Sequence, residues 1–149
     1  MVTKANLENA LKEAMRAGDV LRKTTVRMVL SAIKLVEIDK GVALDENGIL
    51  AVLQKEVKSR REAILDAQRA NRADLAAASE AEIVILESFL PKAMPPEELD
   101  TLARRAVQEV GATSLREMGQ VMKVLMPLLQ GRASGDQASQ AVKKLLQDG

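Results

Sequence analysis

The 149-residue sequence contains no histidine, no cysteine, no tryptophan and no tyrosine, and Phe89 is its single aromatic residue. Without cysteine, disulfides, thiolate zinc sites and cysteine nucleophiles are excluded. Without histidine, the chain lacks the commonest general base and the commonest metal ligand. One aromatic ring leaves almost nothing to stack on nucleobases, which argues against single-strand binding of the RRM or OB type. We therefore expect a protein that is not catalytic on its own and that holds no cofactor or metal.

Long apolar runs are also missing. The densest run, Ile83–Leu86, stops at Glu87, far short of the roughly 18 residues that a membrane-spanning helix needs. The first residues show no apolar segment followed by a small-residue cleavage site, and Glu8 and Glu13 fit poorly with an organelle transit peptide. The sequence therefore predicts a cytoplasmic protein with no membrane partner.

The charge balance is nearly neutral, with 22 basic against 21 acidic residues and a net charge of +1. A protein that binds nucleic acid would need its basic residues gathered locally, because the whole chain carries no excess.

Every periodic segment has the spacing of a helix, and none alternates like a strand. Helices are expected at about 3–17, 19–39, 45–70, 73–90, 95–110 and 118–126, with a break near 127–131 and a last helix that begins near Ser134 or Asp136. Asp19 is a candidate N-cap, and Gly18, Gly41 and Gly111 follow predicted helix ends.

Three of the four prolines lie within residues 91–96, where no helix can continue. This segment is the best candidate boundary between two parts of the chain. The predicted fold is all-α and two-lobed, with a four-helix N-terminal lobe at residues 1–92 and a three-helix C-terminal lobe at residues 95–149.

Two features of the N-terminal lobe have both a functional and a structural interpretation. Lys23, Arg27 and Lys34 fall within a stripe of roughly 40° on one helix, which is either a phosphate-facing ridge or an ordinary solvated face. Glu82 is the one carboxylate inside a predicted apolar stripe, and we interpret it as a paired or snorkelling residue rather than a catalytic one. Arg60 is predicted to pair with Glu56 at i,i+4 spacing.

The C-terminal lobe carries a third basic cluster. From residue 112 onward the chain has five basic and three acidic residues, the basic ones being Arg116, Lys123, Arg132, Lys143 and Lys144. The loop 130–136 precedes a predicted helix N-terminus, where free backbone N–H groups can hold a phosphate, and its glycines Gly131 and Gly135 allow close approach. A simple turn between helices is the alternative interpretation, and the P-loop spacing is absent.

Several short motifs resemble those of the YqeY family. They are Gly-Gln-Val-Met-Lys at 119–123, Met-Pro at 126–127, Gly-Arg-Ala-Ser-Gly at 131–135, Val-Lys-Lys-Leu-Leu at 142–146 and, upstream, Arg-Met-Val at 27–29 and Leu-Glu-Ser-Phe-Leu-Pro-Lys at 86–92. That family is similar to the C-terminal tail of GatB, a subunit of the tRNA-dependent amidotransferase. The resemblance implies a two-lobed helical fold and contact with tRNA at residues 119–123 and 131–133.

The leading hypothesis is a non-catalytic module of glutaminyl- or asparaginyl-tRNA metabolism that binds tRNA through backbone charge and shape. Its predicted RNA contacts are Lys123, Gly131, Arg132, Gly135 and Lys143, together with Arg116 and Lys144. The alternative is an adaptor that docks on an aminoacyl-tRNA synthetase or amidotransferase. A distant alternative, implied only by the resemblance, is a carbon–nitrogen ligase with glutamine as amido donor. Leu128, Leu129 and Gln130 stand where family members often have lysines, a difference that lowers the expected phosphate affinity.

Overall fold

A computed structural model describes residues 2–148, over which the chain is helical and forms no strand. The elements are α1 (Lys4–Ala17), α2 (Val20–Lys40), α3 (Glu46–Arg69), α4 (Ala73–Glu87), α5 (Pro96–Val110), the 3₁₀ turn η1 (Leu115–Glu117), α6 (Met118–Leu129) and α7 (Gly135–Asp148). The prediction of an all-α fold is confirmed.

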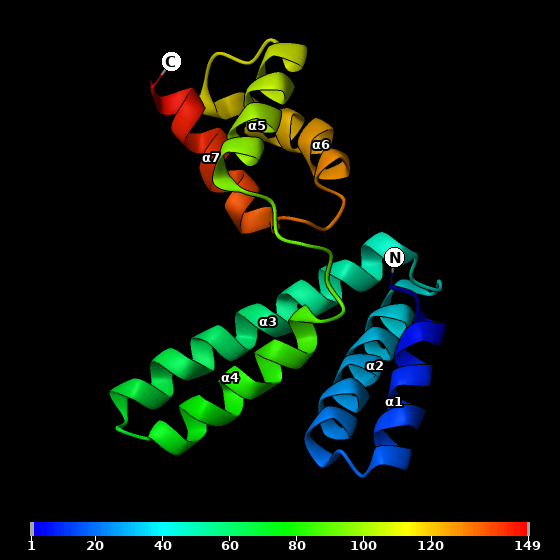
Figure 1. Cartoon of the computed structure of the whole chain (residues 1–149). Coiled ribbons are helices and arrows are strands. Elements are labelled where there is room, and N and C mark those ends of the chain that lie inside the picture. The colour runs from blue at the N-terminus through cyan, green and yellow to red at the C-terminus, as the bar shows by residue number, and fades with distance from the viewer. Residues whose placement is uncertain (1, 149) are drawn as a thin grey trace. The chain divides into compact units, whose positions relative to one another are not determined.

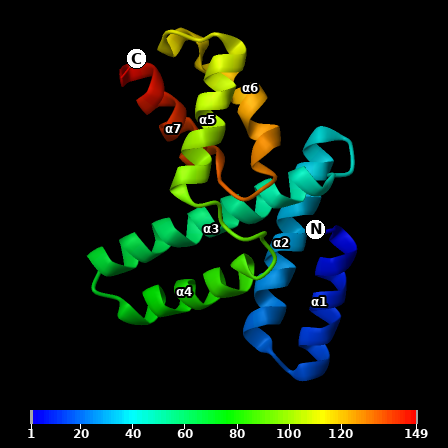
Figure 2. The same ribbon diagram turned by 45° about the horizontal axis from the view of Figure 1, so that its top comes forward.

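The chain divides into two compact units, Met1–Pro91 (unit 1) and Lys92–Gly149 (unit 2). Within unit 1, α1 lies beside α2 and α3 lies beside α4, as both views show (Figures 1 and 2). The core of unit 1 includes Leu7, Val26, Ile33, Leu53 and Leu86. In unit 2, α5, α6 and α7 pack on one another around Ala103, Val121, Leu125, Ala138 and Val142.

Side-chain caps fix where the first three helices begin. Thr3 and Asn6 form a reciprocal capping box, in which Thr3 Oγ1 accepts from the Asn6 N–H and Asn6 Oδ1 accepts from the Thr3 N–H. Asp19, as predicted, accepts from the N–H of the third residue beyond it, and Asp45 does the same at the start of α3. These short-range contacts explain why the helix starts could be read from sequence.

The break predicted near 127–131 begins later than Pro127, because α6 continues through this residue to Leu129. Pro127 has no N–H to donate, so the last turn of α6 lacks one intrahelical hydrogen bond and still continues for two residues. The helix stops instead where Gln130 adopts a left-handed conformation with φ 51°. The predicted end of the fourth helix at Leu90 is also too late, since α4 ends at Glu87.

Some apolar residues of the helices lie in solvent. Met15 is exposed on α1, and Leu75 and Ala78 are exposed on α4, where Ala76, Ile83 and Leu86 form the buried face instead.

Among the helices of residues 2–148, none is long and apolar enough to cross a membrane.

Candidate nucleic-acid interface

The loop between α6 and α7 is held by Arg132, one of the predicted RNA contacts. The Arg132 guanidinium forms two parallel hydrogen bonds with Glu98 of α5, Nη1 to Oε1 at 2.7 Å and Nη2 to Oε2 at 3.0 Å. Its Nε donates to the carbonyl of Lys92 at 3.2 Å. Three of the five N–H donors of Arg132 are therefore used within the chain, and Glu98 neutralises its charge.

The backbone of the same loop is also tied to the segment before α5. The Met94 N–H donates to the Arg132 carbonyl at 2.8 Å, and the Arg132 N–H donates to the Leu129 carbonyl at 2.9 Å. Gly131 has φ 76°, a left-handed conformation that glycine adopts without strain. Side chain and backbone together fix the loop against α5.

The N-terminus of α7 is capped by its own residues. Ser134 Oγ accepts from the Gln137 N–H at 3.1 Å, and Gln137 Oε1 accepts from the Ser134 N–H at 2.9 Å, so Ser134, one of the two predicted starts of this helix, is its N-cap. Asp136 adds a carboxylate to the first turn, where it interacts favourably with the helix dipole and repels a phosphate. This helix end is less suited to an anion than the sequence of the loop suggests.

Gly135 differs from Gly131 in its structural requirement. Its φ is not positive, and a Cβ at this position would lie 3.8 Å from Met126 Cε, an ordinary contact. Of the two loop glycines, only Gly131 is required by the backbone conformation.

The other predicted contacts are exposed cations. Arg116 lies in η1, Lys123 in α6, and Lys143 and Lys144 in α7, and all four are exposed. None of the four forms a salt bridge or side-chain hydrogen bond with any residue in the described part of the chain. Lys123 lies about 200° around α6 from the buried Val121, so its ammonium group extends away from the core of unit 2.

Two further cations of unit 2 were not included in the sequence prediction. Arg104 and Arg105 are exposed on α5 and, like the four above, form no ion pair within residues 2–148. The apolar stripe of α5 could have predicted that these two arginines are exposed. Since Ala103 and Ala106 are buried, the two arginines between them must lie on the solvent side.

Glu82, the carboxylate inside the predicted apolar stripe, is paired. Arg60 of α3 is buried, and its Nε donates to Glu82 Oε2 of α4 at 2.9 Å. Arg60 also pairs with Glu56, as predicted, and its Nη2 lies 3.6 Å from the sulfur of Met28 in α2. The cluster joins three helices of unit 1. Within the described chain there is no group of three or more carboxylates placed to hold a metal ion.

The basic stripe on α2 is only partly solvated. Arg27 and Lys34 are exposed, whereas Lys23 is half-buried. A hydrogen bond from Lys4 lowers the pKa of Glu37, and one from Arg72 lowers the pKa of Asp74.

Comparison with known proteins gives the relationships of the chain. The model of the family described as "Yqey-like protein" matches residues 4–146. Among curated proteins, the chain is similar to "Altered inheritance of mitochondria protein 41, mitochondrial" from three yeasts. The identities are 36% over 108 residues in Vanderwaltozyma polyspora, 44% over 87 in Lachancea thermotolerans and 40% over 114 in Kluyveromyces lactis.

These matches cover 70%, 58% and 76% of this chain and 58%, 46% and 60% of the respective relatives. The chain thus spans about half the length of the curated relatives that it matches.

The predicted cytoplasmic localisation is wrong by this comparison, because the relatives are named as mitochondrial proteins. The prediction relied partly on Glu8 and Glu13, which the structure places in α1, a helix that packs on α2 within a folded unit. Acidic residues in a folded helix say nothing about targeting. The family match covers nearly the whole described chain and agrees with the motifs of both units, and the chain therefore belongs to the YqeY family.

Proposed function

We propose that unit 2 binds tRNA and that the chain acts as a non-catalytic module in aminoacyl-tRNA metabolism. The observation that carries this proposal is a set of exposed cations of unit 2 that have no ion-pair partner among residues 2–148, among them Arg116, Lys123, Lys143 and Lys144. An exposed cation without a carboxylate partner retains its full charge for phosphate and releases counterions when it binds.

The choice of tRNA rests on the resemblance of residues 119–123 and 131–133 to the tail of GatB. The composition favours a particular mode of contact. Phe89 is the single aromatic residue and lies in unit 1, so unit 2 has no aromatic side chain on which a base could stack. Folded RNA offers phosphates and ribose hydroxyls on its outer surface, which side-chain cations and backbone groups can bind without reading the sequence.

The predicted contacts have different roles within this proposal. Lys123 and Lys143 contact phosphates directly, with Arg116 and Lys144 at the margin. Arg132 has two N–H donors left after its three intrachain bonds, so its main role is to hold the loop from Gly131 to Gly135 in place. Arg104 and Arg105 extend the set of exposed cations onto α5.

The experiment is a titration of fluorescein-labelled tRNA with the full chain over a range of salt concentrations. We expect the logarithm of the association constant to fall linearly with the logarithm of salt concentration, with a slope of roughly −2 to −4. The double variant Lys123→Glu/Lys143→Glu is expected to bind at least about tenfold more weakly, with a shallower slope.

The matched control is Lys12→Glu/Lys55→Glu, which makes the same charge change at two exposed lysines of unit 1. This control separates local contact from the loss of net charge. Absence of binding at low salt, or an equal loss in both double variants, would refute the proposal. Recovery of an aminoacyl-tRNA synthetase with the RNase-treated chain, in the absence of tRNA binding, would favour the adaptor function instead.

A further inference from the structure

Helix α2 has a second apolar face that the fold leaves in solvent. Leu21, Met28 and Leu35 are 41%, 46% and 65% exposed, and Val42, just beyond the helix, is 61% exposed. These residues recur every seven positions. Ile38, which is 65% exposed, continues the same face at the alternate spacing of a heptad repeat. None of these exposed residues lies on the buried side of α2, which includes Val26, Val29 and Ile33.

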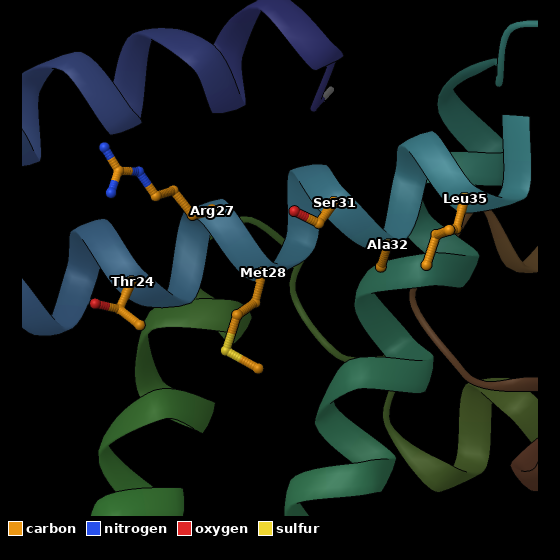
Figure 3. A pocket seen from close by; sticks show the side chains of 6 residues that line it. All are labelled: Thr24, Arg27, Met28, Ser31, Ala32 and Leu35. Carbon is orange, nitrogen blue, oxygen red and sulfur yellow. The ribbon is translucent and has the colours of Figure 1, made fainter. Parts of the chain in front are cut away.

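This face is shaped by alternating large and small side chains. A hollow of about 400 Å³ lies along it, lined by Thr24, Arg27, Met28, Ser31, Ala32 and Leu35, all from α2 (Figure 3). The Thr24 hydroxyl donates to the Val20 carbonyl at 2.9 Å, so it places no unsatisfied polar group in the hollow. Holes between Met28 and Leu35 are what the side chains of a second helix need for close packing.

One edge of the face is basic. Arg27 and Lys34 are exposed seven residues apart, at the position that flanks the seam in a heptad repeat, and neither has an ion-pair partner among residues 2–148. No acidic residue lies between them on this edge. The first acidic residue on the exposed side of α2 beyond them is Asp39, near the end of the helix.

We propose that this α2 face, defined by Leu21, Thr24, Met28, Ser31, Leu35 and Ile38 with its edge of Arg27 and Lys34, docks an acidic amphipathic helix of a partner protein. The heptad spacing fits a helix, and the two cations fit carboxylates along the edge of that helix. The proposal concerns unit 1 and is independent of RNA binding by unit 2.

The charges of this edge disfavour an antiparallel pairing of two copies of α2. In an antiparallel pairing of two α2 helices, the Arg27 and Lys34 edges of the copies would face each other and repel.

The probe is a fluorescent designed peptide of about three heptads, with leucine at the a and d positions and glutamate at e and g. A matched peptide has lysine at e and g. We expect the full chain to bind the glutamate peptide and to bind the lysine peptide at least about tenfold more weakly. Met28→Glu/Leu35→Glu is expected to lower the affinity for the glutamate peptide by at least about tenfold.

Leu65→Glu/Val84→Glu is the control, since these exposed apolar residues lie on α3 and α4, and the variant adds the same negative charge away from the face. The sharper variant is Arg27→Glu/Lys34→Glu, which is expected to reverse the preference and bind the lysine peptide more tightly. Far-ultraviolet circular dichroism of each variant checks that it is folded.

The proposal is overturned if the chain binds neither peptide, or binds both equally. It is also overturned if Met28→Glu/Leu35→Glu and Leu65→Glu/Val84→Glu lose the same affinity for the glutamate peptide. Two other results assign the face differently and equally overturn it. They are a dimer in sedimentation velocity that Met28→Glu/Leu35→Glu dissociates, and binding to phosphatidylcholine–phosphatidylglycerol vesicles that this variant abolishes.

Discussion

Arg132 and Glu98, 34 positions apart in the chain, are joined by two parallel hydrogen bonds of 2.7 and 3.0 Å. The same guanidinium donates to the Lys92 carbonyl, so one side chain connects the loop before α7, the start of α5 and the segment before it. Because the pair is only partly exposed and bidentate, it contributes more than an average surface ion pair. Arg132 is thus a structural tie of unit 2 as well as a predicted RNA contact.

Replacing Arg132 by alanine is expected to lower the free energy of unfolding of unit 2 by about 1 kcal/mol. Lysine in its place restores the charge but not the two parallel bonds, so Arg132→Lys recovers only part of the loss. The measurement is urea unfolding followed by circular dichroism at 222 nm, since the chain has no tryptophan or tyrosine. Arg104→Ala, at an unpaired exposed position of the neighbouring α5, is the control, and equal effects of the two alanine variants would contradict the prediction.

The two loop glycines are expected to respond differently to alanine. Gly131 has φ 76°, where an L-residue is strained, so Gly131→Ala is predicted to cost about 1 kcal/mol. Gly135→Ala has room for its Cβ and an ordinary helical backbone, and its effect is expected to stay within about 0.5 kcal/mol. Thermal unfolding of both variants checks the contrast, and a larger loss for Gly135→Ala would rule it out.

Much of the fold could be predicted because its signals are local. Asp19 caps α2 through a residue three positions away, and the buried stripe of α5 recurs at helical spacing. The break predicted near 127–131 starts only at Gln130, because the left-handed conformation of Gln130, and not Pro127, ends α6.

The candidate site was less predictable because it depends on distant partners. Nothing near Arg132 in sequence indicates that Glu98 neutralises it, so an arginine in a glycine-rich loop resembled a free cation. On α2, the apolar residues recognised from sequence were those of the buried face. Leu21, Met28 and Leu35, which recur every seven residues on the exposed face, belong to the same helix and were not distinguished from them. Only burial separates the two faces.

Arg60 is expected to be the most sensitive charged residue of unit 1. Arg60→Met leaves Glu56 and Glu82 facing each other without their cation, and we expect a loss of about 3 kcal/mol in the free energy of unfolding. The double variant Arg60→Met/Glu82→Leu removes part of that repulsion and is predicted to be more stable than the single variant.

The neighbouring Arg61 provides the control. Its side chain is exposed, and its one ion pair, to Glu87, is 3.6 Å long, so Arg61→Met is expected to change stability by no more than about 0.5 kcal/mol. Urea unfolding of the three variants tests the prediction, and equal losses for Arg60→Met and Arg61→Met would show that the buried cluster does not stabilise unit 1.

The pair formed by Lys4 and Glu37 is expected to make the stability of unit 1 depend on pH. Lys4 Nζ lies 2.9 Å from Glu37 Oε1, and the Leu44 N–H donates to Oε2 at 2.9 Å, so both hydrogen bonds hold the pKa of Glu37 below its ordinary range. A carboxyl with a lowered pKa in the folded state stabilises that state above its unfolded pKa, and this contribution is lost as the pH falls. The hydrogen bond with Glu37 raises the pKa of Lys4, whose contribution is lost as the pH rises through that raised value.

Glu37→Gln is therefore expected to be less stable than the unmodified chain at neutral pH, and the difference should shrink as the pH falls below about 4.3, the ordinary pKa of glutamate. At the other end, the difference should shrink again above about 10.4, where lysine ordinarily loses its proton. Glu13→Gln, an exposed position on α1, is the control. Urea unfolding across this pH range makes the comparison. If the difference between Glu37→Gln and the unmodified chain stayed constant from acid to alkaline pH, the ion pair would not stabilise the fold. Protonation of Glu37 at low pH and deprotonation of Lys4 at high pH would then have left the free energy of unfolding of the unmodified chain unchanged relative to the variant.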